Sequence, residues 1–166
     1  MDSILDQLLK AAELRRNDPR TTSELIELAC LKENESEERR DAIIILHYRG
    51  NREVLDSARA LCESTLASER CTGVDILGQL GVPHRSFPDE SVDILLELLA
   101  KDKEVSVLKA IGIALGHIDS QRAIVPLCLI RNHVDPKVRY GVVHGLMGQT
   151  QAQAVQAMIE LSNDRD

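Results

Sequence analysis

The segment DPKVRYGVVHGLMGQ, residues 135–149, holds the densest group of residues that could do chemistry in this 166-residue chain. Tyr140 and His144 are residue types used in proton transfer. Three glycines could cradle a phosphate: Gly141, Gly145 and Gly148. A phosphate loop needs its glycines between a strand and the start of a helix, where backbone N–H groups are free. The apolar spacing places these glycines inside and at the end of a helix, so we interpret them as sites of close helix packing.

The cysteines do not predict a metal site. They are Cys30, Cys62, Cys71 and Cys128, with no Cys-x-x-Cys spacing, and three of them lie in apolar helical runs. This pattern is typical of free, buried thiols in a reducing compartment. Cys62 and Cys71 could still approach each other across one helical hairpin as a redox pair. We expect no metal and no cofactor.

The composition argues against several classes of partner. The formal net charge is −7, whereas a nucleic-acid-binding face is basic. Tyr48, Phe87 and Tyr140 are the only Phe, Tyr or Trp residues, which are too few for a base-stacking surface or an aromatic cage. No apolar run approaches the ~20 residues of a membrane-spanning helix, and the first residues do not resemble a signal peptide. We therefore expect a cytoplasmic protein that binds neither nucleic acid nor membranes.

Apolar residues recur at helical spacing along nearly the whole chain, and no stretch alternates as a strand does. Equivalent leucines stand near the ends of four helices: Leu46, Leu77, Leu115 and Leu146. The first and last intervals between them are equal, and the middle interval is longer by seven positions. This pattern indicates a tandem repeat of helix pairs, with the extra positions between 78 and 91. The expected pairs span 22–49, 52–80, 90–117 and 121–148, with single helices at 3–15 and 152–162.

The clearest repeat resembles a HEAT repeat of the short, bacterial, phycobilin-lyase-like kind. DPKVRYGVVHGLMG looks like the second helix of that repeat, and Pro126 matches a proline often found in its first helix. The resemblance implies an all-α fold, a right-handed α-solenoid of about four to five helix pairs, forming a single domain over residues 1–166. It also implies that the chain ends in a half repeat or is a piece of a longer solenoid.

Enzymes built on similar repeats provide alternative functions. Deoxyhypusine hydroxylase binds iron through His-Glu dipeptides, and none of the five histidines here precedes a glutamate. HEAT-like DNA glycosylases use Trp, Asp and Arg in a basic groove; Asp75 could stand for the acid, but the chain has no Trp. Phycobilin lyases would need a larger aromatic cavity. A glycosylase-like or lyase-like enzyme is therefore less favoured than a non-catalytic protein of this fold.

A helical wheel of residues 138–148 separates a packed side from a side that would face the concave surface of a solenoid. Tyr140, Val143, His144 and Met147 lie on that second side. Transferring the register by the repeat interval adds Lys109, Gly112 and Ile113, then Cys71, Val74 and Asp75, then Arg40, Ile43, Ile44 and His47.

Exposed apolar strips bordered by charge mark contact sites. We therefore predict a non-catalytic scaffold that binds a protein or peptide along this inner strip, with Arg40, Asp75 and Lys109 tuning specificity by charge. The alternative is that the superhelix itself covers part of the strip.

Two further contact sites are predicted. The loop VPHRSFPDE carries Phe87, whose ring could anchor a partner or fold inward to fill a gap between helix pairs. The last helix has apolar residues that no following helix covers, which would allow a homo-oligomer to form through Val155, Met158 and Ile159.

Overall fold

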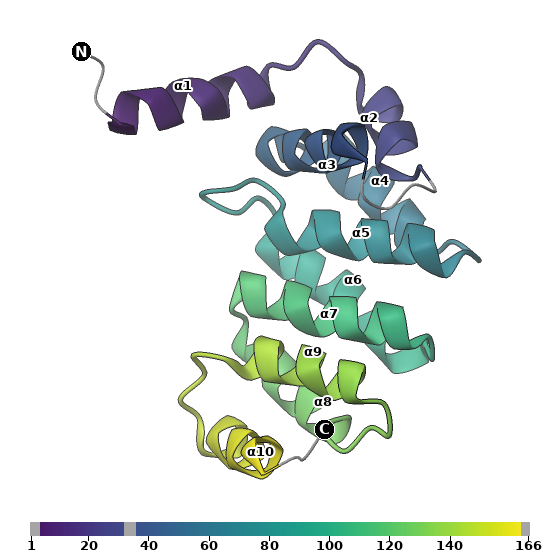
Figure 1. Cartoon of the computed structure of the whole chain (residues 1–166), viewed down its shortest axis with the longest axis vertical. Helices are drawn as coiled ribbons and strands as arrows, with labels where there is room; N and C mark the ends of the chain where they lie inside the picture. Colours follow the sequence, from purple (N-terminus) through teal and green to yellow (C-terminus); the bar gives the residue numbers. More distant parts are fainter. Residues whose placement is uncertain (1–3, 32–35, 164–166) are drawn as a thin grey trace.

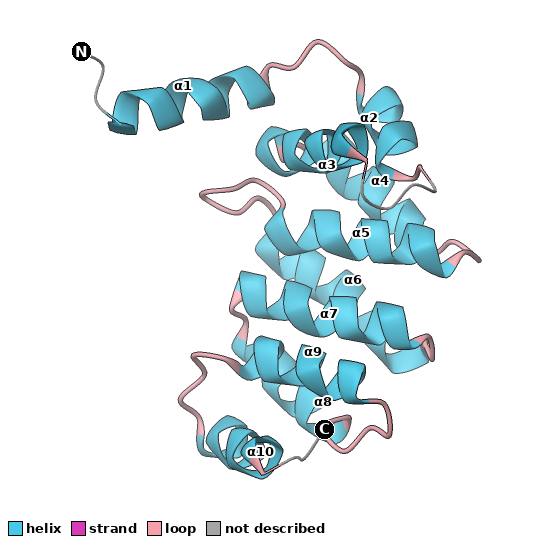
Figure 2. Cartoon of the chain, viewed as in Figure 1, coloured by secondary structure: helices cyan, strands magenta, loops and turns pink. Residues whose placement is uncertain are grey.

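The computed structural model describes residues 4–31 and 36–163. Over these residues the regular secondary structure is helical throughout, which confirms the all-α expectation (Figure 2). The predicted helix positions agree with the observed bounds to within two residues, although the expected start at residue 3 lies outside the described part. No helix in this part of the chain is long and apolar enough to cross a membrane.

The elements in chain order are α1 (Ile4–Arg16), α2 (Thr22–Ala29), α3 (Glu37–Arg49), α4 (Arg52–Cys62), α5 (Ala67–Gln79), α6 (Pro88–Lys101), α7 (Val105–Ile118), the 3-10 turn η1 (Gln121–Ala123), α8 (Ile124–Leu129), α9 (Pro136–Leu146) and α10 (Ala152–Ser162).

The helices form two layers (Figure 1). Helices α3, α5, α7 and α9 lie side by side in the front layer of this view, and consecutive members are in contact. Helices α4, α6 and α8 lie behind them, and each packs against the front-layer helix that follows it. At one end of the array α1 and α2 pack on α3, and at the other end α10 packs on α8 and α9. Each helix pair therefore buries its apolar side against its neighbours.

Side-chain caps determine where several helices begin. Thr21 and Glu24 form a capping box: the Thr21 hydroxyl accepts the N–H of Glu24 at 3.2 Å, and the Glu24 carboxylate accepts the N–H of Thr21 at 2.7 Å. Asp135 accepts the N–H of Lys137 at 2.8 Å, and Pro136 stands in the first turn of α9. These capping residues thus mark where a polar loop ends and the next amphipathic helix begins.

The core is aliphatic and lies between the two layers. The four leucines that defined the repeat are all at most 1% exposed: Leu46, Leu77, Leu115 and Leu146. Leucines of other helices are equally buried: Leu25, Leu55, Leu95 and Leu127. The repeat interval read from the sequence therefore identifies true core positions.

Front-layer helices approach so closely that backbone meets backbone. A Cβ atom built on Gly112 would lie 2.4 Å from the carbonyl oxygen of Gly141, and one built on Gly141 would lie 2.8 Å from that of Lys109. One built on Gly145 would lie 2.8 Å from the carbonyl oxygen of Gly112. These positions accept no side chain unless a helix shifts, so the interpretation of Gly141 and Gly145 as packing residues is confirmed. The same interpretation is wrong for Gly148, where a Cβ atom would meet nothing within 4 Å and the φ of 84° is that of a turn.

The extra residues form the loop between α5 and α6, and hydrogen bonds fasten this loop to the helix ends beside it. The N–H of Gly81 donates to the carbonyl oxygen of His47 at 2.7 Å. The Arg85 guanidinium donates to the carbonyl oxygens of Gly78 at 3.1 Å and His117 at 2.9 Å. The loop thereby links the C-terminal ends of α3, α5 and α7.

Of the two alternatives for Phe87, the structure shows the inward one: the ring packs on the core and does not project from the loop. Phe87 adopts a left-handed backbone conformation at the start of α6, with φ of 52°, and its half-buried ring packs on the core. The Arg52 guanidinium lies over the ring, 4.3 Å from its centroid, and forms an ion pair with Glu90 at 2.6 Å. Removing the ring from water and placing a cation over it favours this inward position.

Replacing Gly112 or Gly141 with alanine is expected to lower the free energy of unfolding by about 1–3 kcal/mol, because the added methyl group forces two helices apart. The direction of the change in stability is informative, because replacing glycine with alanine on an open helix face raises the free energy of unfolding by roughly 0.5–1 kcal/mol. Urea denaturation followed by circular dichroism measures the difference. A gain in stability would contradict the backbone contact between α7 and α9.

Candidate binding groove

One row of side chains from each front-layer helix opens onto a common groove. The row follows the i, i+4 spacing of a helix surface. Its members, all exposed or half-buried, are Arg40, Ile44 and Tyr48 on α3; Cys71, Asp75 and Gln79 on α5; Lys109, Ile113 and His117 on α7; and Tyr140 and His144 on α9. We call these residues the groove row.

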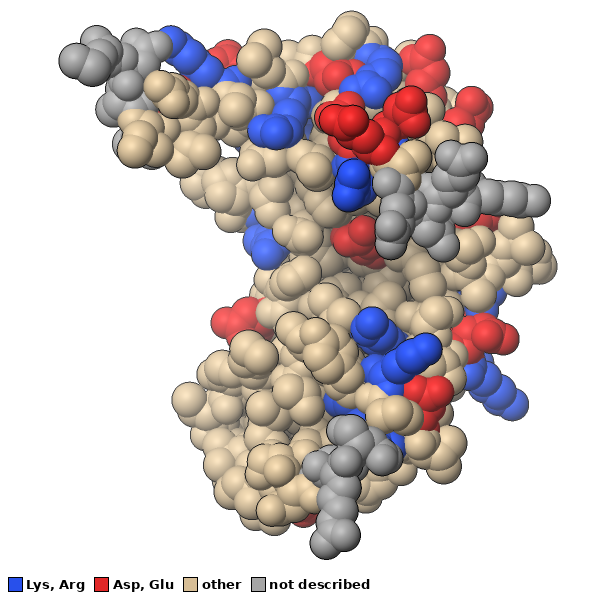
Figure 3. All heavy atoms as spheres, in the orientation of Figure 1, with Lys and Arg blue, Asp and Glu red and all other residues tan. Residues whose placement is uncertain are grey.

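The largest hollow of the groove, about 510 Å³, lies between α1, α3 and α5. Its apolar lining comes from Ile43, Ile44 and Tyr48. Three arginines also line it: Arg15, Arg39 and Arg40. Figure 3 shows basic side chains over α1 and α3 on this face of the molecule. We call this space the arginine hollow.

A second hollow of about 260 Å³ lies between α5 and α7. It shares Arg39 and Asp75 with the arginine hollow, so the two spaces adjoin. Ile113, His117 and Cys71 contribute further to its lining. Burial raises the pKa of the Cys71 thiol, which therefore stays protonated at neutral pH.

The C-terminal part of the groove brings together three of the predicted contact residues. The Lys109 ammonium lies 5.4 Å from the centroid of the Tyr140 ring, and the rings of Tyr140 and His144 have their centroids 4.6 Å apart. Met147 follows α9 and is 58% exposed, while Val143 is half-buried. This end of the groove therefore presents aromatic, apolar and charged atoms.

The predicted inner strip included residues that the structure buries, and His47 is the main one. The side chain of His47 is only 6% exposed, and Ile43 and Val74 are also buried. These residues lie on the side of their helix that meets the next front-layer helix, which covers them. Within the described residues no further helix extends the front layer beyond α9, so Val143 and Met147, at the equivalent positions, stay more accessible (Figure 1).

The buried His47 links α3 to α5. Its Nε2 lies 3.1 Å from the carbonyl oxygen of Asp75, which can only accept, so Nε2 carries a proton and donates it. Burial lowers the pKa of His47, although the nearby Asp75 carboxylate, 4.0 Å away, opposes the shift. The imidazole is therefore neutral at pH 7 and acts as a structural donor.

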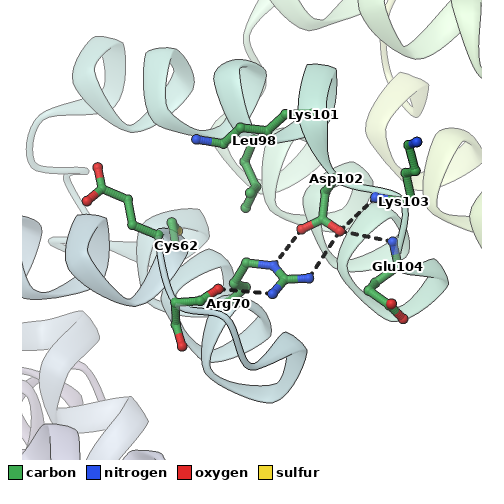
Figure 4. A pocket seen from close by; sticks show the side chains of 9 residues that line it. Cys62, Arg70, Leu98, Lys101, Asp102, Lys103 and Glu104 are labelled. Atoms are coloured by element: carbon green, nitrogen blue, oxygen red, sulfur yellow. Dashed lines mark hydrogen bonds and ion pairs between the residues drawn. The ribbon is translucent and has the colours of Figure 1, made fainter.

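A further hollow of about 430 Å³ lies outside the groove, where the α4–α5 and α6–α7 connections meet (Figure 4). An ion pair of 2.6 Å joins Arg70 to Asp102, which also accepts the N–H groups of Lys103 and Glu104. Burial would raise the pKa of Asp102, but these hydrogen bonds outweigh it and hold the pKa below its ordinary value. Burial also raises the pKa of Cys62 to about 12. The polar groups here hold the helix ends together, so we interpret this hollow as structural.

No three His, Cys, Asp or Glu side chains are placed to hold a metal ion in residues 4–31 and 36–163. All four cysteines are free, and Cys62 and Cys71 do not form the disulfide that the redox alternative required.

Sequence reasoning missed several groove residues. Tyr48, Gln79 and His117 each lie four residues beyond a predicted contact, so extending the i, i+4 row by one turn would have found them. Arg15 and Arg39 gave no such signal. Arg15 lies in a helix that precedes the repeats, and Arg39 reaches the groove with a long side chain from another side of α3.

Comparison of the chain with models of protein families and with curated proteins finds no match. The function is therefore inferred from the residues of the groove.

Stability is expected to fall as the pH drops from about 7.5 to about 5.5, because the unfolded chain takes up protons that the folded chain resists. Burial holds the pKa of His47 and of His117 below the ordinary value of 6.5, and Arg85 acts on both in the same direction. The stability contributed by neutral His47 is therefore present above pH 6.5 and is lost below it. Urea midpoints at the two pH values measure the loss.

The variant His47→Gln should show a smaller difference between the two midpoints. His84, in the α5–α6 loop, has an exposed ring, so His84→Gln is the matched control and should keep the full difference. An equal difference in His47→Gln and in the unmodified chain would contradict the role of burial at His47.

Proposed function

We propose that this protein is an α-solenoid of HEAT-like repeats that binds a protein or peptide segment along its groove and catalyses no reaction. The two-layered stack of helix pairs and the regular recurrence of the core leucines support the solenoid assignment. The groove row supports the binding role, because it has members on each of the four front-layer helices, α3, α5, α7 and α9.

The observation that carries this proposal is the pairing of exposed apolar side chains with isolated charges. Ile44 is 39% exposed and Tyr140 52%, and both belong to the groove row, as do Arg40 and Asp75. Apolar atoms supply affinity once water is removed, whereas the charges select the partner and orient it.

The dimensions of the groove suit an extended segment. Four helices spaced by roughly 10 Å give a groove about 30 Å long, which corresponds to about nine residues of extended chain. Side chains at alternate positions of such a segment would enter the two hollows of about 510 Å³ and 260 Å³.

The chemistry of the groove favours binding over catalysis. In the part of the chain that the structure describes, burial raises the pKa of Cys71, a thiol that lines the groove, and His47 already donates to a carbonyl oxygen. Activated nucleophiles need a lowered pKa or a free general base beside them. His117 lines the same hollow as Cys71, but the pKa of the thiol is raised rather than lowered, so this pair does not form an activated nucleophile.

A peptide display library of about twelve randomised residues, panned on the purified chain, tests the proposal. We expect enriched peptides whose binding, measured by fluorescence anisotropy, weakens at least about tenfold in Ile44→Glu and in Ile113→Glu, since a charged side chain replaces the apolar contact at each position. Ile44→Glu carries the test if Ile113→Glu fails to fold, because Ile44 is the more exposed of the two.

The matched controls are Val125→Glu and Leu129→Glu. Val125 is 55% exposed and Leu129 78% exposed, and both lie on α8 in the rear layer. Binding should survive these substitutions. Failure to enrich any peptide, or equal losses in groove and control variants, would overturn the proposal.

Self-association is a second candidate function, favoured by the apolar face of α10. Val155 is 43% exposed and Ile159 53% exposed, and Met158 beside them is half-buried. Figure 3 shows largely uncharged surface over α9 and α10 in this view. A second copy of the chain would cover this face.

Sedimentation velocity over a range of concentrations tests this second candidate. The chain should form dimers that the double variant Val155→Glu/Ile159→Glu abolishes. Gln153→Glu adds one negative charge to the other side of α10 and should leave the dimers intact. A monomer at every concentration would contradict self-association.

A further inference from the structure

The arginines of the arginine hollow differ from the other arginines of the chain in their partners. Arg15 lies 5.5 Å from the centroid of the Tyr48 ring, and Arg39 donates to the Thr72 hydroxyl at 3.3 Å. The Arg40 guanidinium has no hydrogen bond or ion pair within the described residues. None of the three forms an ion pair with a carboxylate in that part of the chain.

In the rest of the described chain, most guanidinium groups have a carboxylate or a backbone carbonyl oxygen as partner. Arg20 pairs with Asp18 and Asp41, and on the rear side Arg122 pairs with Asp93. Others pair with glutamates or donate to backbone carbonyl oxygens: Arg52, Arg131, Arg49 and Arg85. In a chain of net charge −7, these three guanidiniums line one hollow together with a single carboxylate, that of Asp75, and form no ion pair with it, so the hollow offers donors to an external anion.

The repeat register explains why Arg39 has no carboxylate. Counted back from the core leucine at the end of each helix, Arg39 on α3 and Arg70 on α5 occupy equivalent positions. Arg70 is paired with Asp102 of the next helix pair. By the same count, the residue equivalent to Asp102 one pair earlier is Ser64, which cannot form an ion pair. The substitution of a hydroxyl for a carboxylate leaves Arg39 to line both hollows of the groove.

The surroundings of these arginines define what kind of anion fits. Ile43, Ile44 and Tyr48 line the same hollow, so a neighbouring aliphatic side chain of the ligand would find apolar contact there. Asp75 also lines the hollow and would repel a phosphate dianion more strongly than a single carboxylate. The adjoining second hollow lets the ligand chain continue toward α7.

We propose that the arginine hollow is the subsite for acidic side chains, Asp or Glu, of an extended peptide segment that also carries aliphatic residues. This inference rests on the proposed function and specifies the ligand of the same groove. The guanidiniums of Arg39 and Arg40 donate to the ligand carboxylates, and the apolar members of the groove row, Ile44, Ile113 and Tyr140, hold the rest of the segment. The C-terminal carboxylate of a peptide is not required, because the groove continues beyond the arginines.

Nucleic acid fits the hollow less well than an acidic peptide does. Single-stranded nucleic acid binds by stacking bases on aromatic rings along a basic path. Beyond the arginine hollow the groove row offers one lysine, Lys109, and one further aromatic ring besides Tyr48, that of Tyr140. The net charge of −7 adds long-range repulsion.

The test repeats the display selection on the unmodified chain and on the double variant Arg39→Gln/Arg40→Gln. Peptides selected by the unmodified chain should be enriched in Asp and Glu beside aliphatic residues, and this enrichment should vanish in the variant. For one selected peptide, labelled with fluorescein, changing its acidic residues to Gln or Asn should weaken binding at least about tenfold, since charge-assisted hydrogen bonds are among the stronger ones. The same change should have little effect on binding to the variant.

Arg122→Gln is the matched control, because Arg122 is exposed and lies outside the groove. It should keep both the enrichment and the affinity. Circular dichroism establishes that each variant is folded, and Arg40→Gln alone serves if Arg39→Gln disturbs the packing near Thr72.

The possible results separate this inference from the proposed function. If peptides without acidic residues are selected, and Ile44→Glu abolishes their binding while Arg39→Gln/Arg40→Gln does not, the subsite assignment is overturned and the groove remains a peptide site. If no peptide is enriched, the groove proposal and the subsite fail together. Binding of a labelled oligouridylate that the double arginine variant loses would overturn the subsite in favour of nucleic acid.

Discussion

The contact of backbone against backbone between neighbouring front-layer helices determines the rest of this structure. At Gly112 and Gly141 the missing side chains let α7 and α9 touch through their carbonyl groups. Gly78 has a similar role on α5, where a Cβ atom would lie 2.9 Å from the Cα atom of Ala114 on α7. Such contacts fix the rotation of each helix about its own axis. This rotation decides which side chains are covered by the next helix and which open onto the groove.

Departures from the repeat shape the groove as much as the repeat itself. The extra residues between α5 and α6 link the ends of three front-layer helices through Gly81 and Arg85. The replacement of an aspartate position by Ser64 separates two arginines with the same register: Arg70 is locked in a partly buried ion pair, whereas Arg39 lines the groove. The two arginines share one register, and the residue at the position of Asp102 decides which of them is held in an ion pair.

Charged side chains are arranged differently in the two layers. Exposed ion pairs such as Arg122–Asp93 contribute little to stability, because water screens them. The arginines around the arginine hollow are free of such partners, and the apolar residues beside them are accessible to a ligand. The rear layer thus supports the fold with aliphatic packing and paired charges, and the groove holds the charges that remain available for a partner.

The sequence by itself determined the helices, their pairing, the position of the inserted loop and the packing role of Gly141 and Gly145, because these depend on local periodicity and on caps such as Thr21 with Glu24. It also located part of the groove, including Arg40, Ile44 and Asp75. Only the tertiary structure decided that His47 is buried, that Phe87 turns inward and that Arg15 and Arg39 join the groove. The reason is physical: a helical wheel gives the angle between residues of one helix, but the angle at which that helix meets its neighbours depends on contacts between residues far apart in the chain.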